Sequence, residues 1–313
     1  MGRLTSLVTG GTGFLGRYLV RRLAESGYDI TLLARRPIEP YRTIVADLRQ
    51  PELPPLDAVF DEVYHLAGLA HTVPASRAAG ERFFQVNTEG THRLLEALER
   101  AGRPPGALVY ISSVAVYGLE EGSLLDEETP RRASDPYGAS KREAEDLVME
   151  WSARHQVRAS IVRLPLVVGR GAPGNLRAMI EAMCKRRYWG VSPGTARRSM
   201  VAAADVSEIL PRLARTGGVF HLTDGEHPSF AELEEALAAA LGRKAPRRLP
   251  GWIARLAAWA GDVLERVTGV AVPINSRVLR KMTSTLTFSD GRARRTLSWK
   301  PTRVLDRLSE LVA

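Results

Sequence analysis

A glycine-rich turn directly after a short apolar run constrains this chain most strongly. The run at 4–9 reads LTSLVT, and it is followed by Gly10-Gly11-Thr12-Gly13-Phe14-Leu15-Gly16 and a helical pattern. In such a turn Gly10 permits a backbone conformation closed to other residues, Gly13 lets a pyrophosphate approach the main chain, and Gly16 lets helix pack on strand. The helix N-terminus then offers free N–H groups and the positive end of its dipole to the phosphates. The turn therefore predicts a dinucleotide-binding site.

The first half of the chain alternates strand-like apolar runs with amphipathic segments of helical length, which is typical of a parallel sheet covered by helices. The expected strands span 4–9, 30–34, 43–46, 62–66, 107–112 and 158–163, and the expected helices span 14–26, 81–101 and 136–154. We therefore expect an α/β fold with a Rossmann doubly wound parallel sheet over 1–166, to which a strand near 219–222 returns within 201–224. Residues 167–200 and 225–313 are expected to form a smaller, mostly helical substrate-binding lobe, with helices near 174–187, 229–241, 251–267 and 303–311.

Charge and composition narrow the classes of partner. The 44 Lys and Arg residues against 35 Asp and Glu give a net charge of +9, which attracts anions such as phosphates. Aromatic residues make up 6% of the chain and do not alternate with the basic clusters, so we expect no nucleic-acid binding. The single cysteine, Cys184, can form neither an internal disulfide nor a cysteine metal cluster, so no metal site is expected. With no signal-peptide pattern and no run of about 20 uncharged apolar residues, we expect a cytoplasmic protein without a membrane span.

The end of the second expected strand favours NADP over NAD. An acidic residue there would accept the 2′-hydroxyl of NAD, but the chain reads Ala34-Arg35-Arg36 with no carboxylate. Paired guanidinium groups can hold a 2′-phosphate through forked hydrogen bonds. NADP is therefore the predicted cofactor, and NAD is the alternative if both arginines are solvated. Asp47 and Leu48, after the third strand, are predicted to meet the edge of the adenine.

Tyr137 and Lys141 lie four residues apart at the start of an expected helix, in the sequence Tyr-Gly-Ala-Ser-Lys. Their side chains therefore project from one face of that helix. An ammonium beside a phenol favours the phenolate, which suits Tyr137 to act as acid or base near neutral pH in a carbonyl–alcohol interconversion. Ser112 and Ser113 end the fifth strand, at the sheet edge where ligands bind. We choose Ser113 as the hydroxyl that bonds the reacting oxygen.

Five motifs stand at the ends of the expected strands and helices: TGGTGFLG at 9–16, HLAG at 65–68, NTEGT at 87–91, SSVAVYG at 112–118 and YGASK at 137–141. Over nearly the whole chain they resemble the extended short-chain dehydrogenase/reductase family, in its nucleotide-sugar epimerase and dehydratase branch. The resemblance implies a catalytic triad of Ser113, Tyr137 and Lys141, with Tyr137 moving the proton and Lys141 also holding the nicotinamide ribose. With the glycine turn and the arginine pair, it gives the following cofactor-binding set: Gly10, Gly13, Phe14, Leu15, Gly16, Arg35, Arg36, Asp47, Leu48, Leu66, Ala67, Gly68, Asn87, Tyr137, Lys141 and Pro165.

The second half of the chain shares in the resemblance. Gly174-Asn175-Leu176 and Arg198 match segments that, by the resemblance, bind the diphosphate of a sugar nucleotide, and an arginine fork suits two phosphate oxygens. Asn175 is equally well explained as a helix N-cap. The segment 274–289, followed by 297–301, resembles members of the branch that reduce UDP-linked 4-keto-6-deoxy-N-acetylhexosamines in surface-polysaccharide synthesis. Arg277 or Arg280 would add a diphosphate contact, and the substrate set is Ser113, Asn175, Arg198 and Arg280.

These features predict an NADPH-dependent 4-ketoreductase of a nucleotide-diphosphate sugar. Hydride would pass from the nicotinamide to C4 while Tyr137 protonates the developing alkoxide and Ser113 steadies it. A nucleotide-sugar 4-epimerase with tightly bound NAD would use the same triad and is the alternative. Dehydration is disfavoured because Val114 stands where 4,6-dehydratases carry an acidic residue. A non-catalytic NADP-binding sensor is the remote alternative, and the intact triad argues against it.

An apolar stripe runs along the expected helix at 251–267, where it comprises Trp252, Ile253, Leu256, Trp259, Ala260, Val263 and Leu264. We interpret it as lobe core or an oligomer contact and not as a membrane-surface helix, because Asp262 and Glu265 dilute the positive face that binding to anionic lipid needs. The basic clusters at 185–187, 243–248 and 277–307 are interpreted as solvated faces in preference to polyanion sites. By the resemblance we also expect a homodimer formed by the helices at 81–101 and 136–154.

Overall fold

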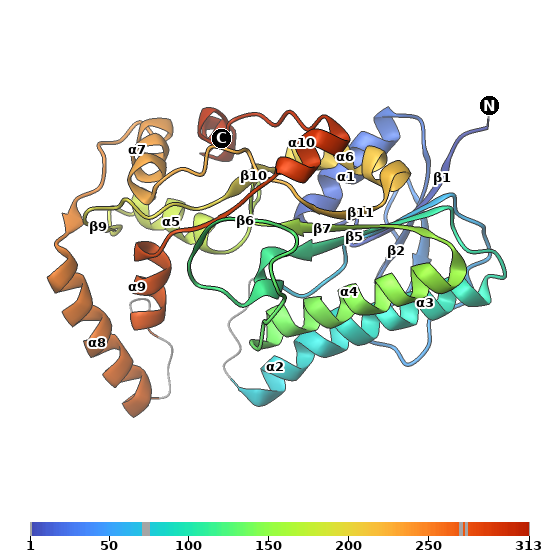
Figure 1. The fold of residues 1–313 in the computed structure, drawn as a ribbon, viewed down its shortest axis with the longest axis horizontal. Coiled ribbons are helices and arrows are strands. Elements are labelled where there is room, and N and C mark those ends of the chain that lie inside the picture. Colours follow the sequence, from blue (N-terminus) through green and yellow to red (C-terminus); the bar gives the residue numbers. More distant parts are fainter. Residues whose placement is uncertain (1, 71–75, 269–271, 273–274, 313) are drawn as a thin grey trace.

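A seven-stranded sheet with all strands parallel forms the centre of the computed structural model, which describes residues 2–70, 76–268, 272 and 275–312 (Figure 1). The strand order is β11-β7-β5-β4-β1-β2-β3. The strands are β1 (Thr5–Thr9), β2 (Asp29–Ala34), β3 (Arg42–Val45), β4 (Glu62–His65), β5 (Ala107–Ser113), β7 (Arg158–Leu164) and β11 (Gly218–His221). The order reverses between β1 and β4, which is where such sheets open a ligand crevice at their carboxyl ends. The predicted Rossmann fold is confirmed, and the returning strand is β11, paired with β7.

The sheet is buried on both faces because successive residues of its strands are apolar and point to opposite sides. Val8 and Val109 point to one face, and Leu7 and Leu108 point to the other. The first face is covered by α1 (Phe14–Glu25), α6 (Ala203–Thr216) and α10 (Gly291–Leu297). The second is covered by α3 (Glu89–Arg100) and α4 (Pro136–His155), which lie side by side below the sheet in Figure 1. Strands that are apolar at successive positions therefore predict a sheet with helices on both faces.

The helix expected at 81–101 is not a regular α-helix. It begins earlier, as α2 (Arg77–Phe83), passes through a π-helical turn (Phe84–Thr88) and continues as α3. The π turn contains Asn87, whose side chain is 1% exposed. Such turns are rare and occur often at functional sites because the extra residue redirects a side chain. Here the turn aims Asn87 at the loop that follows β4.

The lobe is built from short elements around a core of its own. Val168, Leu176, Met200, Leu237 and Val304 belong to that core. Besides α8, described below, its helices include α5 (Asn175–Cys184), α7 (Phe230–Ala240), α9 (Ser276–Thr283) and α11 (Ser309–Val312). The helix expected at 303–311 is instead a 3-10 turn (Val304–Arg307) followed by the single turn of α11. Helices α6, α9 and α10 were not predicted.

Among the described residues, three pairs of short parallel strands lie outside the central sheet. They are β8 (Leu166–Val168) with β10 (Met200–Ala202), β9 (Gly190–Val191) with β12 (Arg248–Leu249), and β6 (Gly122–Leu125) with β13 (Leu286–Phe288). The last pair joins the C-terminal segment to the loop after β5. Ile274, the first residue of the C-terminal segment that carried the finer resemblance, lies outside the described residues.

Helix α8 (Gly251–Thr268) corrects one expectation. Its apolar stripe is not lobe core, because Trp252, Leu256 and Trp259 are 64%, 59% and 66% exposed. The buried side of the helix carries the small residues Ala254 and Ala258 instead. α8 lies at the outer edge of the lobe, far from the central sheet (Figure 1). Among the described residues, no helix combines the length and the apolar character needed to cross a membrane.

Candidate active site

The glycine turn between β1 and α1 has the shape that a pyrophosphate needs. Gly10 has a φ of +71°, and a Cβ on it would lie 2.6 Å from the backbone nitrogen of Ala67, so only glycine fits between the ends of β1 and β4. A Cβ on Gly16 would lie 2.0 Å from the carbonyl oxygen of Gly10, which fixes how closely helix and turn pack. At Gly13 the added atom would meet only that same oxygen, at 3.1 Å.

Gly13 is the N-cap of α1. Because glycine has no side chain, this residue offers no side-chain acceptor to the first N–H groups of the helix. Phe14, Leu15 and Gly16 belong to the first turn of this helix, and that turn carries no acidic residue. Uncapped N–H groups and the positive end of the helix dipole favour an anion. The open side of Gly13 and this helix end together fit a dinucleotide pyrophosphate.

Two exposed arginines lie where the ribose end of the cofactor is predicted. Arg35 and Arg36 follow β2 directly and are exposed. Asp47, the nearby carboxylate after β3, is held by Arg49 through bonds of 2.7 to 3.2 Å, and this partner, more than Arg35, lowers the pKa of Asp47 to about 2. Leu48 is buried against the sheet, so Asp47 alone presents a side chain at the predicted adenine edge. The arrangement suits a 2′-phosphate because no carboxylate stands at the end of β2 beside the two arginines.

The end of β4 is fastened on two sides. The backbone N–H of Ala67 donates to the Thr9 hydroxyl at 3.2 Å, and that of Leu66 to the Thr9 carbonyl at 3.1 Å. Asn87 accepts from the N–H of Leu69 at 2.7 Å and donates to its carbonyl at 3.1 Å. Asn87 therefore acts by positioning the loop after β4, with its amide already bonded.

Gly68 lies where that loop meets the catalytic lysine. A Cβ on Gly68 would stand 3.1 Å from Oδ1 of Asn87 and 3.4 Å from Nζ of Lys141. The remaining predicted cofactor residue, Pro165, lies between β7 and β8 and is half-buried. The residues predicted from the turn, β4 and α4 thus meet at the carboxyl edge of the sheet.

The two serines at the end of β5 have different roles. Ser112 is 3% exposed and donates to Oε1 of Glu145 at 2.5 Å, which makes it part of the interior. Ser113 is half-exposed, and its hydroxyl oxygen accepts from the N–H of Ala115 at 3.2 Å. A hydroxyl that accepts from the backbone keeps its own proton free to donate. This geometry supports Ser113 as the residue that faces the reacting oxygen.

Tyr137 lies in the first turn of α4, which Asp135 caps by accepting from the N–H of Gly138 at 3.0 Å. A Cβ on Gly138 would lie 2.5 Å from the carbonyl oxygen of Ala115, so the glycine lets α4 approach the turn after β5. That approach brings Tyr137 to Ser113. Burial raises the pKa of Tyr137, and the hydrogen bond with Ser113 opposes this rise.

Lys141 points into the interior. Its ammonium donates to the carbonyl of Ile111 at 2.7 Å and to the hydroxyl of Tyr110 at 3.0 Å, and burial lowers its pKa to about 7. The expected lowering of the Tyr137 pKa by Lys141 is not found, because the ammonium is engaged with β5 and burial dominates at the tyrosine. The structure therefore brings Ser113 and Tyr137 together, with Lys141 one helical turn further on.

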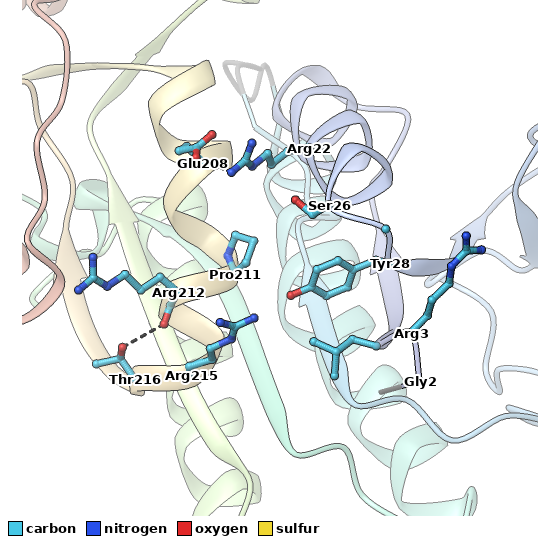
Figure 2. A pocket seen from close by; sticks show the side chains of 12 residues that line it. Gly2, Arg3, Arg22, Ser26, Tyr28, Glu208, Pro211, Arg212, Arg215 and Thr216 are labelled. Carbon is cyan, nitrogen blue, oxygen red and sulfur yellow. Dashed lines mark hydrogen bonds and ion pairs between the residues drawn. The ribbon is translucent and has the colours of Figure 1, made fainter.

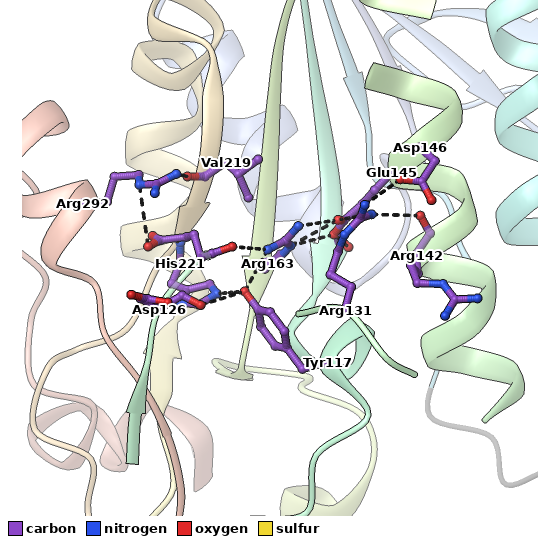
Figure 3. A network of polar contacts seen from close by, with 12 residues as sticks. Tyr117, Asp126, Arg131, Arg142, Glu145, Asp146, Arg163, Val219, His221 and Arg292 are labelled. Carbon is purple, nitrogen blue, oxygen red and sulfur yellow. Dashed lines mark hydrogen bonds and ion pairs between the residues drawn. The ribbon is translucent and has the colours of Figure 1, made fainter. Parts of the chain in front are cut away.

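A buried polar network behind these residues was not predicted (Figure 3). Arg163 on β7 donates to both carboxylate oxygens of Glu145 on α4, at 2.8 to 3.2 Å, and to the hydroxyl of Tyr117 at 2.8 Å. Tyr117 is hydrogen-bonded in turn to His221 on β11. Sequence signals existed for two members. Glu145 follows Lys141 by four residues on one helix face, and Arg163 is a charge within an apolar strand, which needs a buried partner.

Apart from Ser113, which ends β5, the predicted substrate residues lie on the lobe. Asn175 is the first residue inside α5 and is exposed, and the N-cap is Gly174, so its interpretation as an N-cap was wrong. Arg198 donates to the carbonyl of Lys281 on α9, while its Nη1 is buried without a hydrogen-bond partner among the described residues. Arg280 is 61% exposed and forms an ion pair with Glu120 at 3.1 Å. An unpaired buried guanidinium nitrogen is costly unless a ligand completes it, which fits an anionic group beside Arg198.

A separate groove of about 1140 Å³ lies at the opposite edge of the sheet (Figure 2). Arg3, Arg22, Tyr28, Arg212 and Arg215 line it, between the end of α1 and α6. These residues precede β1, β2 and β11, so the groove opens at the amino ends of the strands. Because open parallel sheets bind their ligands at the carboxyl ends, we do not assign the cofactor to it.

A Rossmann sheet with a pyrophosphate turn, and a serine and a tyrosine meeting beside it, defines a nicotinamide-dependent enzyme of the short-chain dehydrogenase/reductase type. The chain belongs to the NAD dependent epimerase/dehydratase family, whose model matches residues 6–221. This match covers the sheet from β1 to β11.

Relatives cover almost the whole chain. The N-acetyl-alpha-D-glucosaminyl-diphospho-ditrans,octacis-undecaprenol 4-epimerase of Escherichia coli O157:H7 is 28% identical, over 90% of this chain and 86% of its own. Among solved structures, MoeE5 in complex with UDP-glucuronic acid and NAD is 25% identical, with a TM-score of 0.76 over 99% of this chain and 98% of its own. RMD from Pseudomonas aeruginosa, complexed with NADPH, is 25% identical, with a TM-score of 0.73 over 98% of both chains. Both NAD and NADPH therefore occur in structures like this one.

Proposed function

We propose that the chain is an NADPH-dependent 4-ketoreductase acting on a UDP-linked 4-keto-6-deoxy-N-acetylhexosamine in polysaccharide synthesis. The observation that carries the proposal is the exposed pair of Arg35 and Arg36 at the carboxyl end of β2, where no acidic residue stands. This end suits a 2′-phosphate and not a free 2′-hydroxyl. The RMD structure complexed with NADPH supports this choice of cofactor.

Each residue of the triad has a separate part in the proposed reaction. NADPH, when bound, supplies the hydride that reaches C4 of the ketone. Tyr137 delivers a proton to the C4 oxygen, so that hydride and proton together convert the ketone to a secondary alcohol. Ser113 donates a hydrogen bond to the same oxygen as negative charge develops on it. Lys141, whose ammonium donates to Ile111 and Tyr110, would also bind the nicotinamide ribose.

The lobe would bind the diphosphate of the substrate. Arg198 has a buried Nη1 that lacks a partner among the described residues, and Asn175 and Arg280 stand exposed on α5 and α9. Charge-assisted hydrogen bonds from a guanidinium to phosphate oxygens are among the stronger polar contacts. MoeE5, which was solved with UDP-glucuronic acid, supports a nucleotide-diphosphate sugar as the substrate class.

The test is an assay with UDP-4-keto-6-deoxy-N-acetylglucosamine and either NADPH or NADH. We expect cofactor oxidation only when the sugar is present, one reduced sugar per cofactor, and a preference for NADPH. Enzyme without substrate serves as the blank. If folded protein consumes neither cofactor with this substrate, the reductase proposal is wrong.

A 4-epimerase is the second candidate, and the Escherichia coli relative favours it. In this case the hydride leaves C4 and returns to its other face within one binding event, so cofactor is not consumed. That relative acts on a sugar carried by undecaprenyl diphosphate, which makes a lipid-linked sugar diphosphate a second form of substrate to test. The distinguishing result is interconversion of the C4 epimers with no net change in cofactor absorbance.

For the assembly we keep the homodimer predicted from the sequence, formed through α3 and α4. These two helices lie side by side on one face of the sheet, and Met149 on α4 is 46% exposed. Pairs of helices from two copies would form a four-helix contact with two-fold symmetry. Sedimentation velocity of wild type and Met149→Glu tests this, since a charge in the contact should shift a dimer toward monomer. The cytoplasmic location also stays a prediction.

A further inference from the structure

Helix α8 presents a continuous apolar face to solvent. Trp252, Leu256, Trp259, Val263 and Val267 are 64%, 59%, 66%, 38% and 79% exposed. At 100° per residue their side chains fall within a sector of about 80°, on one side of a helix about 27 Å long. The opposite side carries the buried residues Ala254, Ala258 and Gly261. An apolar strip of this length along an 18-residue helix is more than the scattered apolar exposure normal for a protein surface.

The acidic residues of α8 do not belong to this face. Asp262 accepts from the N–H of Ser276 at 3.0 Å and also from its hydroxyl, which fastens the start of α9. Glu265 accepts from the N–H of Val272 at 2.8 Å and from the amide of Asn275 at 3.0 Å. Both carboxylates therefore serve contacts within the lobe. Asp262 also lies close to Arg266, and after the hydrogen bonds from Ser276 the charge of Arg266 helps to lower the pKa of Asp262, so this carboxylate offsets part of the positive charge beside the strip.

Basic side chains border the same face. Arg255 and Arg266 are exposed and lie beside the Trp252–Trp259 edge of the strip, by the same angular count. Strand β12 leads directly into α8 and pairs with β9, so the exposed Trp189, which precedes β9, lies beside the segment that enters the helix. Lys185, Arg186 and Arg187 are exposed in the turn between α5 and β9. Arg243, Lys244 and Arg247 are exposed in the segment before β12. An apolar strip with tryptophans and a basic border is the composition of helices that lie in a membrane interface.

We propose that α8 docks this protein on an anionic membrane surface, with its apolar strip in the acyl boundary and the basic border on the lipid phosphates. Charge complementarity selects this occupant over a second copy of the chain. In a two-fold contact the same patch meets itself, so the basic borders would face each other and repel. An anionic lipid surface attracts them instead. The docking surface lies apart from the cofactor cleft, and the proposal does not depend on the reaction proposed above.

The first test is co-sedimentation with vesicles of phosphatidylcholine containing phosphatidylglycerol, and with vesicles of phosphatidylcholine alone. Wild-type protein should pellet with the anionic vesicles, and less so as salt screens the basic border. Trp252→Ser/Trp259→Ser should weaken binding about tenfold or more, because two interfacial aromatic anchors are lost. Val59→Ser/Leu124→Ser removes two exposed apolar side chains elsewhere, 42% and 60% exposed, and should bind as wild type does. If the double tryptophan variant fails to fold, Lys185→Ala/Arg186→Ala/Arg187→Ala tests the border alone.

A second readout uses the tryptophans themselves. Trp189, Trp252 and Trp259 lie on the proposed surface, while Trp151 and Trp299 are 5% and 4% exposed in the interior. Vesicles with brominated acyl chains should therefore quench part of the emission, and Trp252→Ser/Trp259→Ser should abolish most of that quenching. Absence of pelleting with anionic vesicles at low salt overturns the proposal, as does unchanged binding by the tryptophan variant. If that variant instead loses self-association in sedimentation velocity and keeps its lipid binding, the face is an interface between copies.

Discussion

The ammonium of Lys141 donates a hydrogen bond of 2.7 Å to the main-chain carbonyl oxygen of Ile111. This bond ties α4, which carries Tyr137, to β5, which ends in Ser113. Because the lysine is only 5% exposed, burial lowers its pKa to about 7, against an ordinary value of 10.5. Glu145, one turn further along α4, opposes this shift. The position of the catalytic helix is thus coupled to a lysine whose charge changes near neutral pH.

Lys141→Met is expected to change how stability depends on pH. Below pH 7 the lysine is protonated in both states, and its burial cost is fully present in the folded protein. Between pH 7 and 10.5 the unfolded chain still holds the proton while the folded chain has released it, so the free energy of unfolding rises with pH through this residue. The variant lacks this rise. Its free energy of unfolding relative to that of wild type should therefore be most favourable at pH 6, by on the order of a few kcal/mol. Urea unfolding at pH 6 and pH 10 checks this, and equal differences at both pH values contradict it.

Tyr137→Phe is expected to remove the proton donor and leave cofactor binding intact. Loss of a positioned acid typically costs about 10²- to 10⁴-fold in rate, so kcat should fall by that factor. The dissociation constant for NADPH should stay within about twofold, since the ring that packs against Phe83 at 5.8 Å remains. Tyr41→Phe, at a half-buried tyrosine on the other side of the sheet, is the control. If Tyr137→Phe turned over substrate as fast as wild type, Tyr137 would not be the proton donor of the reaction.

Removing one partner of the Arg163–Glu145 pair is expected to be costly. Both side chains are buried, at 4% and 0% exposure, so Arg163→Met leaves a buried carboxylate that has lost its main partner. Such a loss costs about 3–5 kcal/mol, whereas Arg163→Met/Glu145→Leu should recover much of it. Arg177 and Glu181 form the matched surface pair, 70% and 50% exposed, and breaking it should cost under about 1 kcal/mol. Guanidinium chloride unfolding of these variants measures the difference. If the double variant loses as much unfolding free energy as the two single variants together, the two residues do not stabilise the fold as a pair.

The sheet and the triad could be predicted because their signals are local. β1, the glycine turn and α1 follow one another along the chain, and Tyr137 and Lys141 share one helix face. The contacts that fix the ammonium of Lys141 are not local. Ile111 and Tyr110 lie about 30 residues away and contact the lysine only once α4 packs on β5. The apolar stripe of α8 is the opposite case, because periodicity reveals an apolar face without revealing whether another element covers it.

Arg35→Ala/Arg36→Ala is expected to reduce the preference for NADPH. Each charge-assisted hydrogen bond to a phosphate contributes about 1.5–3 kcal/mol, so KM for NADPH should rise at least about 10-fold for each such bond that is lost. KM for NADH should change little, because NADH carries no 2′-phosphate. Arg42→Ala removes an exposed arginine from the amino end of β3 and is the control for general charge. An equal rise in KM for both cofactors would mean that the pair does not read the 2′-phosphate.

Arg198→Ala is expected to weaken substrate binding without affecting the cofactor. Nη1 of Arg198 is buried and lacks a partner among the described residues, and burial lowers the pKa of this guanidinium, so the side chain pays a desolvation cost that an anionic ligand would offset. We expect KM for the sugar diphosphate to rise about 10- to 100-fold, with KM for NADPH and the unfolding midpoint nearly unchanged. Arg197→Ala is the matched control, since that neighbouring guanidinium already contacts Glu232 at 3.4 Å and His227 at 3.0 Å. If both variants raise KM for the substrate equally, general positive charge and not the buried nitrogen of Arg198 attracts the diphosphate.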